Sequence, residues 1–448
     1  MSELNSLKST PDWFTKSSIY QINPRTFSEA GTLKSIEEEL PFLADLGFKI
    51  IYLCPIFKAD DTLEGRSPRQ LASKTENPKN PYRMNDFFEI DEEYGSMDDL
   101  KSLIAEAHRL KLKVMLDLVY LHIGPNADIL KKHPEFAMHD EQGNVILTKW
   151  NFPQLNYENA GLREYLWCNM TYYVGVLDVD GFRCDVGDLV PLDFWIEGKR
   201  RIRAINPDAV LLNEGSDWTY LEKCFDASYA FKWHSAIYKI ISGNASAQLL
   251  REVNNEISGR IPHGAILMRD MDNHDTVTDW PIRAETVAGH DGMELIEALN
   301  FAIDGIPMVY CGNELGDSVR LSMFANRFYM GDFEVTDRSK KNEPYSIRRQ
   351  TVIKALNSLR SKYDALCFGN TEWKDTDDNE RLICFERFLD SEKIIFIGNF
   401  SNDEAQTKFS PQKYEVLAQS LVPPTVSDGK INLKAYGYSI FKTKETIR

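Results

Sequence analysis

Short apolar runs alternate with longer amphipathic stretches from about residue 17 to about residue 365. The runs are rich in Val, Ile and Leu and are not interleaved with polar residues, which is typical of strands in a parallel sheet covered on both faces. We predict a strand at each of these runs: Ser18–Asn23, Ile50–Ile56, Val114–Tyr120, Gly181–Val186, Val210–Asn213, Ala227–Phe231, Ala265–Met268 and Pro307–Cys311.

The stretches between the runs carry helix signals. One expected helix, Ser35–Leu46, ends at Gly47, and another, Ser96–Leu110, opens with a serine and has two aspartates in its first turn. Eight strands that alternate with helices predict an α/β fold, a (β/α)₈ TIM barrel. An open, doubly wound sheet would alternate in the same way, and the number of strands favours the barrel.

Two segments interrupt this alternation. Lys58–Pro81 is long, polar and rich in proline, so we expect a loop on the barrel face where the strands end. Residues 123–159 are too many for an ordinary βα loop, and they predict a small inserted subdomain after the third strand.

The pattern changes again after the expected helix Tyr345–Lys362. Arg381–Phe388, Lys393–Phe400 and Tyr436–Phe441 are rich in β-forming residues and are divided by Asp, Ser, Asn and Gly. The step at Asp390-Ser391 predicts a hairpin. We therefore predict a barrel over 1–122 and 160–365, the inserted subdomain over 123–159, and a C-terminal antiparallel β-sandwich domain over 366–448.

The formal net charge of −16 argues against nucleic acid and anionic membrane surfaces as partners. The seven cysteines are scattered and form no C-x-x-C pair, which suits a reducing compartment. The N-terminus has no apolar core of a signal peptide, and no stretch approaches the length of a membrane span. We predict a cytoplasmic protein. The sequence does not indicate an oligomeric state.

Three of the predicted strands lead directly into an acid: Gly181–Asp185, Val210–Glu214 and Ala265–Asp275. The carboxyl ends of barrel strands converge on one face, so acids that are remote in sequence can share one pocket there. Two carboxyl groups on either side of a sugar–sugar bond, with a third nearby, are the groups that a glycosidase needs.

Arg183 lies two residues before Asp185, so both side chains point to the same side of the strand. A guanidinium at that place would keep Asp185 ionised and oriented, as a nucleophile requires. Burial among apolar residues would raise the pKa of Glu214, as a general acid requires. The structural alternatives are an ion pair that lines the barrel and a glutamate that caps a strand.

Further motifs accompany the three acids in a fixed order along nearly the whole chain. With these motifs the chain resembles the α-amylase family, glycoside hydrolase family 13. The motifs are Ile19–Phe27, Leu53–Phe57, Asp91–Gly95, Asp117–His122 and Gly305–Glu314.

The resemblance implies roles for individual residues. Asp185 matches the catalytic nucleophile, Glu214 the general acid/base, and Asp275 the third carboxylate, which binds sugar hydroxyls. The resemblance also assigns substrate binding to Arg183 beside the nucleophile. Asp117 matches an aspartate that braces this arginine.

The resemblance assigns three more substrate-binding residues. His122 and His274 match histidines that hydrogen-bond the sugar at the cleavage point, and Tyr82 matches an aromatic platform beneath that sugar. A single histidine at a strand end more often has a structural role. Without the other motifs, Tyr82 could be an ordinary aromatic residue of a loop.

Some positions depart from the family pattern. Leu121 stands where a calcium-ligating asparagine is expected, and Gln154 replaces an expected aspartate. A hydrocarbon side chain cannot ligate calcium, which requires oxygen. We therefore predict no metal and no cofactor. Asp188-Leu189 replace a Lys-His pair after the nucleophile, and Arg83 stands where exo-acting glucosidases of the family usually have aspartate.

The leading functional hypothesis is a retaining hydrolase of α-1,4-linked glucans or maltooligosaccharides. A glucanotransferase or sugar isomerase would use the same residues and differ in what reaches the covalent intermediate. A catalytically silent sugar-binding relative is the remote alternative, because such proteins lose one or more of the three acids, and all three are present here.

Overall fold

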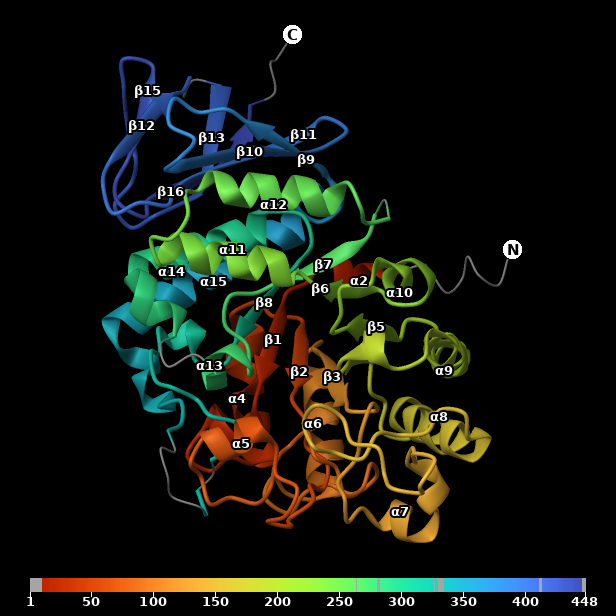
Figure 1. The fold of residues 1–448 in the computed structure, drawn as a ribbon. Coiled ribbons are helices and arrows are strands. Elements are labelled where there is room, and N and C mark those ends of the chain that lie inside the picture. The colour runs from red at the N-terminus through yellow and green to blue at the C-terminus, as the bar shows by residue number, and fades with distance from the viewer. Residues whose placement is uncertain are drawn as a thin grey trace.

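A computed structural model describes residues 10–262, 264–279, 283–325, 327–328, 334–410 and 413–444. Eight parallel strands close into a barrel in sequence order, which confirms the predicted TIM barrel (Figure 1). The strands are β1 (Ile19–Ile22), β2 (Ile50–Leu53), β3 (Lys113–Leu118), β4 (Gly181–Cys184), β5 (Val210–Asn213), β6 (Ala227–Tyr229), β7 (Ile266–Arg269) and β8 (Ile306–Tyr310).

Helices surround the barrel on its outer side (Figure 1). The longer ones are α4 (Leu33–Asp45), α6 (Met97–Arg109), α8 (Ala160–Gly175), α9 (Leu192–Ile205), α11 (Phe231–Ile241), α12 (Gln248–Ser258), α14 (Ala284–Ala302) and α15 (Pro344–Lys362). Shorter ones are α2 (Asp12–Thr15), α3 (Pro24–Phe27), α5 (Pro68–Ala72), α7 (Asp128–Lys132), α10 (Trp218–Lys223), α13 (Thr276–Asp279) and α16 (Asp364–Phe368).

The start of α4 differs from the expected position by two residues. Thr32 is the N-cap, and its side chain and that of Ser35 each accept a hydrogen bond from the other residue's backbone N–H. This reciprocal capping box satisfies two donors at the helix end, so Ser35 lies inside the first turn. Ser96 caps α6 in the same way, together with Asp99.

Buried side chains fill the barrel interior. Most strands are buried at every position, as expected for a sheet covered on both faces. Large residues from strands on all sides of the barrel, including Tyr52, Met115 and Met268, meet in one cluster, and Phe14 of α2 joins them. The interior is therefore a packed core, and the pocket described below lies beyond the strand ends.

The two irregular segments lie between barrel strands and helices. The first, which follows β2, contains α5 within the region expected to be a loop. Residues 123–159 contain α7 and the 3₁₀ turn η1 (Pro134–Phe136), and isolated bridges such as Ala137–Leu155 and Leu147–Pro153 fold the segment back on itself. The domain boundaries remain predictions.

The C-terminal strands form the predicted antiparallel β domain at one end of the molecule, beyond α12 (Figure 1). Asp390 adopts φ +50° in the turn between the paired residues Leu389 and Glu392, at the expected hairpin. The five-stranded sheet has the order β13-β16-β11-β10-β9 and the three-stranded sheet β12-β15-β14. The bounds are β9 (Asn370–Lys374), β10 (Leu382–Leu389), β11 (Glu392–Asn399), β12 (Ala405–Lys408), β13 (Tyr414–Gln419), β14 (Thr425–Ser427), β15 (Lys430–Leu433) and β16 (Tyr438–Thr443).

Apolar side chains from both sheets meet in one buried cluster, which includes Ile395, Ile431 and Phe441. The domain is joined to the barrel by polar contacts as well, since Arg387 lies 3.8 Å from Asp304. None of the helices within the described ranges combines the length and the apolar character needed to cross a membrane.

Candidate active site

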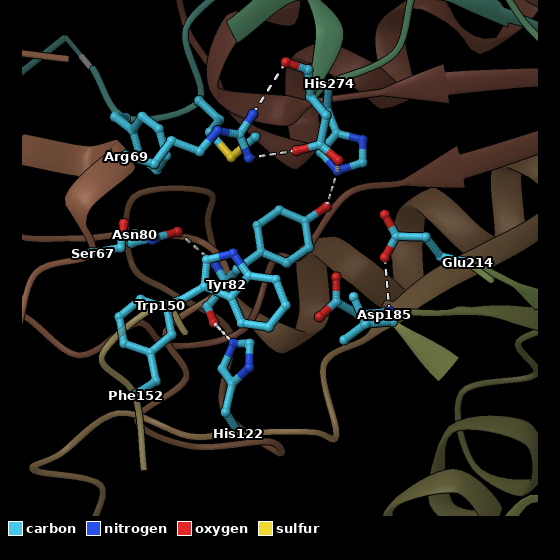
Figure 2. A pocket seen from close by; sticks show the side chains of 14 residues that line it. Ser67, Arg69, Asn80, Tyr82, His122, Trp150, Phe152, Asp185, Glu214 and His274 are labelled. Atoms are coloured by element: carbon cyan, nitrogen blue, oxygen red, sulfur yellow. Dashed lines mark hydrogen bonds and ion pairs between the residues drawn. The ribbon is translucent and has the colours of Figure 1, made fainter. Parts of the chain in front are cut away.

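A pocket of about 80 Å³ opens at the carboxyl ends of the barrel strands. Six of the residues singled out in the sequence line it together, although they come from loops and strands far apart in the chain (Figure 2). Arg183, the seventh, is fully buried beside them. The lining residues are Ser67, Arg69, Asn80, Tyr82, His122, Trp150, Phe152, Asp185, Val186, Glu214, His274, Asp275, Met323 and Phe324.

The guanidinium of Arg183 holds three carboxylates together. Its Nη1 donates to Asp117 at 2.7 Å and to Asp185 at 2.9 Å, and its Nη2 lies 2.9 Å from a carboxyl oxygen of Glu214. Asp117 and Arg183 are fully buried, so their charges interact without screening by solvent. One cation therefore fixes the carboxyl groups of Asp185 and Glu214 close to each other.

Asp185 and Glu214 share an environment that favours retention of a proton. Burial raises the pKa of Asp185 well above its usual range, against the opposing charge of Arg183. Burial also raises the pKa of Glu214 to about 7, again opposed by Arg183.

A backbone N–H is aimed at Glu214 by an unusual local conformation. Val186 has φ +38° and ψ +45°, in the left-handed region that β-branched residues rarely adopt. Its N–H donates to Glu214 Oε2 at 2.7 Å. Such a conformation costs on the order of 1–3 kcal/mol and persists where surrounding structure fixes it. Here it orients one carboxyl oxygen of Glu214.

The turn after Glu214 is fixed by Asp188, one of the residues that departs from the family pattern. Its carboxylate accepts hydrogen bonds from the side chain of Asn213 at 2.6 Å and from the backbone N–H groups of Ser216 and Asp217 at 2.6 and 2.8 Å. A Cβ at Gly215 would come within 2.1 Å of this carboxylate, so any other residue there would have to displace Asp188.

Asp275 is held by a residue that the sequence analysis did not single out. Arg69 of α5 donates through Nη1 to Asp275 Oδ1 at 2.6 Å and through Nη2 to its backbone carbonyl at 3.1 Å. Burial opposes ionisation of this carboxyl, but the charge of Arg69 and its hydrogen bond lower the pKa of Asp275 below the usual range. Asp275 keeps 36% of its side chain exposed, so the carboxylate is accessible from the pocket.

His274 belongs to a chain of hydrogen bonds that fixes its tautomer. The Gln21 amide nitrogen lies 2.8 Å from His274 Nδ1 and donates to it, so the ring proton is on Nε2. Nε2 lies 2.7 Å from the Tyr82 hydroxyl, which in turn donates to Asp117 at 2.9 Å. Burial lowers the pKa of His274 to about 4, so the ring is neutral at pH 7.

His122 is neutral as well, because burial lowers its pKa to about 4. Its Nε2 donates to the backbone carbonyl of Tyr82 at 2.8 Å, which ties the two loops together. The rings of Trp150 and Phe152, both from the 123–159 segment, lie beside it at 5.5 and 5.0 Å between centroids. That segment therefore supplies part of the pocket wall (Figure 2).

The lining residues that sequence reasoning missed come mostly from irregular segments. Ser67, Arg69 and Asn80 belong to the region that was expected to be a loop on this face, but their residue types carried no signal. Arg83 does not line the pocket: its fully buried side chain donates to Asp60 at 3.0 Å and to backbone carbonyls of the same segment.

The residues at the expected calcium position do not fit that ion. Leu121 contributes a buried hydrocarbon, and the carbonyl oxygens of Leu121 and Gln154 already accept backbone N–H groups. In the residues described, no three His, Cys, Asp or Glu side chains gather closely enough to hold a metal. The absence of calcium stays a prediction, and the chemistry proposed for the pocket uses protein groups alone.

Comparisons with known proteins agree with this arrangement. The family described as "Alpha amylase, catalytic domain" matches residues 10–143 and 138–343. A cyclomaltodextrinase from Geobacillus thermopakistaniensis is 26% identical over 88% of this chain and 71% of its own. An intracellular maltogenic amylase from Bacillus subtilis is 24% identical over 88% of this chain and 70% of its own.

Solved structures show the same fold. A maltogenic alpha-amylase from Thermotoga neapolitana superposes with a TM-score of 0.81 at 24% identity, over 96% of this chain and 99% of its own. An alpha-amylase from Lactobacillus plantarum gives a TM-score of 0.80 at 22% identity, over 96% and 100%. The match to the catalytic-domain family spans more than half of the chain. The chain therefore belongs to the alpha-amylase family of glycoside hydrolases.

Proposed function

We propose that the protein hydrolyses α-1,4-linked glucans or maltooligosaccharides with retention of configuration, through a covalent glycosyl-enzyme intermediate. The observation that carries this proposal is the single guanidinium of Arg183, which contacts both Asp185 and Glu214 beside a pocket. Retaining enzymes need their two carboxyl groups close together, because one of them attacks the sugar directly. The relatives named as cyclomaltodextrinase and maltogenic amylase support an α-glucan as the substrate class.

Asp185 serves as the nucleophile. Of the two buried acids it is the one that accepts a hydrogen bond from Arg183, which favours its carboxylate form. Its oxygen bonds to the anomeric carbon as the bond from that carbon to the leaving oxygen breaks. In the reactive state that we propose, Asp185 is ionised and Glu214 carries a proton.

Glu214 serves as general acid and then as general base. With a pKa of about 7, it holds a proton in a large fraction of molecules at neutral pH. It gives this proton to the departing sugar oxygen. In the second step it takes a proton from water, the water oxygen bonds to the anomeric carbon, and Asp185 is released.

The remaining groups bind and orient the sugar. Asp275 offers carboxylate oxygens to sugar hydroxyls, and the neutral imidazoles of His122 and His274 suit hydrogen bonds to an uncharged ligand. Tyr82 supplies a flat apolar face. Its ring is fixed by the hydroxyl contacts to Asp117 and His274.

We also propose a cytoplasmic location. All seven cysteines are free thiols, and disulfides are rare in reducing compartments. The relative from Bacillus subtilis is named an intracellular enzyme, which supports the same location.

The test is a product analysis on maltoheptaose. We expect shorter oligosaccharides whose new reducing ends are first released as the α-anomer, detected by proton NMR before mutarotation. A first-formed β-anomer would refute the retaining mechanism. Oligosaccharides longer than the substrate would identify a transferase in place of a hydrolase.

A further inference from the structure

The segment that follows β2 forms the wall of the pocket opposite the reacting acids. Figure 2 shows Arg69, Ser67 and Asn80 on one side of Tyr82, and Asp185 and Glu214 on the other. We call residues 58–81 the wall segment, and the end of the pocket that it borders the donor end. We propose that Arg69 closes the donor end, so that the protein attacks α-glucans from the non-reducing terminus and releases glucose.

The direction of the substrate follows from the proposed function, on which this inference rests. Glu214 protonates the leaving oxygen, so the leaving part of the chain lies on the Glu214 side. In the sugar that bonds to Asp185, C4 lies across the ring from C1 and therefore faces the donor end. Any further glucose units towards the non-reducing terminus extend from that C4 oxygen, directly towards the wall segment.

Arg69 is fixed in place by contacts with Asp275 and Phe324. Its two terminal nitrogens donate to the side chain and to the backbone carbonyl of Asp275, at 2.6 and 3.1 Å. Its guanidinium also lies over the ring of Phe324, 5.5 Å from the centroid. Arg69 remains 28% exposed and lies beside the acceptor oxygens of Asp275. Neighbouring hydroxyls of a terminal sugar can bind both.

The wall segment is held by buried polar groups. The fully buried Gln70 donates to the carbonyls of Asn77 and Pro78, both at 3.0 Å, and Asn77 donates to the carbonyl of Phe324 at 2.9 Å. Arg83 anchors the first part of the segment through Asp60. Ser67 caps α5 by accepting the N–H of Gln70 at 3.0 Å. The wall is therefore formed before substrate arrives.

The pocket is small: its volume of about 80 Å³ is well below the ~300–1,000 Å³ of typical small-molecule sites. Arg83 does not argue against chain-end attack, because its side chain points into the wall segment and away from the pocket.

The experiment compares two maltoheptaosides, one with a free non-reducing end and one with that end blocked by a 4,6-ethylidene group, and follows their cleavage by chromatography of the products. We expect the wild-type enzyme to cleave the free substrate at least ~10-fold faster, because the blocking group removes hydroxyls that the closed end binds. In Arg69→Ala this ratio falls towards one, since the wall loses its closing side chain. Lys74→Gln removes an exposed charge from the same segment and leaves the ratio unchanged.

Equal cleavage of both substrates by the wild type would overturn the inference while leaving the hydrolase proposal intact. An unchanged ratio in Arg69→Ala would overturn the role of Arg69. Failure of the wild type to cleave either substrate, or any maltooligosaccharide, would overturn the proposed function and this inference together. If Arg69→Ala does not fold, Arg69→Lys replaces it in the comparison. This variant keeps the charge but loses the two-point contact with Asp275, so we expect a ratio between that of the wild type and one.

Discussion

Two groups of buried acids in this molecule have similar electrostatics and different surroundings. The first, which we call the open group, comprises Asp185, Glu214 and Asp275 with Arg183. The second, which we call the sealed group, comprises Glu285, Glu294, Glu297 and Glu314, which lie beside Arg349, Arg348 and Arg338. All members of the second group are at least 95% buried. Only the first group borders the strand-end pocket.

The pKa shifts alone would not separate the two. Burial raises the pKa of Glu297 to about 8, partly opposed by Arg349, and neither of its carboxyl oxygens has a hydrogen-bond partner among the described residues. Arg349 instead pairs with both oxygens of Glu285 at 3.0 Å. Glu297 borders a cavity of only about 10 Å³. The comparison shows that a perturbed acid indicates a site only where a cavity of useful size and converging polar groups accompany it.

The largest effect is expected for Asp185→Asn, which removes the proposed nucleophile from the open group. The kcat should fall by at least ~10⁴-fold, as for other nucleophile deletions, because no covalent intermediate can form. Turnover is measured on maltoheptaose, and the fold is checked by circular dichroism. Activity near that of the wild type would remove Asp185 from the mechanism.

Glu214→Gln should lower kcat on maltooligosaccharides by about 10²–10⁴-fold, because no proton reaches the leaving oxygen. A substrate whose leaving group is an acidic phenol needs less protonation of its leaving oxygen, so the rate of its first step should fall less in this variant. In the wild type, kcat should decline as pH rises through about 7, where Glu214 loses its proton. A pH profile of the variant that kept this decline would assign it to another group.

Glu297→Gln tests the sealed group. The folded state keeps the proton of Glu297 up to about pH 8, whereas the unfolded chain releases it near the ordinary glutamate value. The stabilising effect of this proton is therefore complete below the unfolded pKa and is lost as pH rises towards 8. The variant should gain on the order of 3 kcal/mol relative to the wild type between pH 5 and 9.

The measurement is the melting temperature of both proteins across this pH range, together with kcat at pH 7. We expect kcat to stay unchanged, because Glu297 does not line the pocket. A large loss of activity with an unaltered melting profile would contradict the division into an open and a sealed group.

Tyr82→Phe removes a hydroxyl from the open group and leaves the ring. The hydroxyl bridges Asp117 and His274, and one such hydrogen bond contributes about 1 kcal/mol, or roughly a fivefold loss of kcat/KM. The matched control is Tyr414→Phe in the C-terminal domain, which should leave kcat/KM unaltered. Equal losses in both variants would argue against a role for the Tyr82 hydroxyl.

The smallest effect is expected for removal of metal. Arginines neutralise both acid groups, and the residues at the usual calcium position do not fit the ion. Incubation with EDTA should therefore leave the melting temperature and kcat unchanged. If EDTA lowered the melting temperature or kcat and added calcium restored it, the protein would have a metal site, contrary to the prediction from the sequence.

Much of the open group could be predicted from the sequence because regular structure positions it. Asp185 and Glu214 each follow a short apolar run, and the closure of a parallel barrel brings such strand ends to one face. Arg183 could be assigned to the same side because strand residues two apart share a face. These inferences depend only on local sequence and on the topology of the fold.

The remainder of the pocket could not be predicted, because irregular segments carry no periodicity. Arg69 lies in a polar, proline-rich stretch, and its contact with Asp275 spans 206 positions along the chain. Trp150 and Phe152 line the pocket because isolated β-bridges fold the 123–159 segment back on itself, and no sequence pattern predicts these bridges. The position of Arg83 next to Tyr82 suggests a place in the pocket, but its side chain points into the wall segment and binds Asp60.

The anchoring of the wall segment has an evolutionary consequence. Its anchoring bonds run partly within the segment, from Gln70 to Asn77 and Pro78, and partly to residues outside it, such as Phe324 and Asp275. None of these partners lies in a barrel strand. Insertions or deletions between Asp60 and Arg83 can therefore accumulate without shifting the register of β2 or the position of Asp185. Descendants of one ancestral barrel can diverge in which end of a polymer they digest while they inherit the bond-breaking chemistry unaltered.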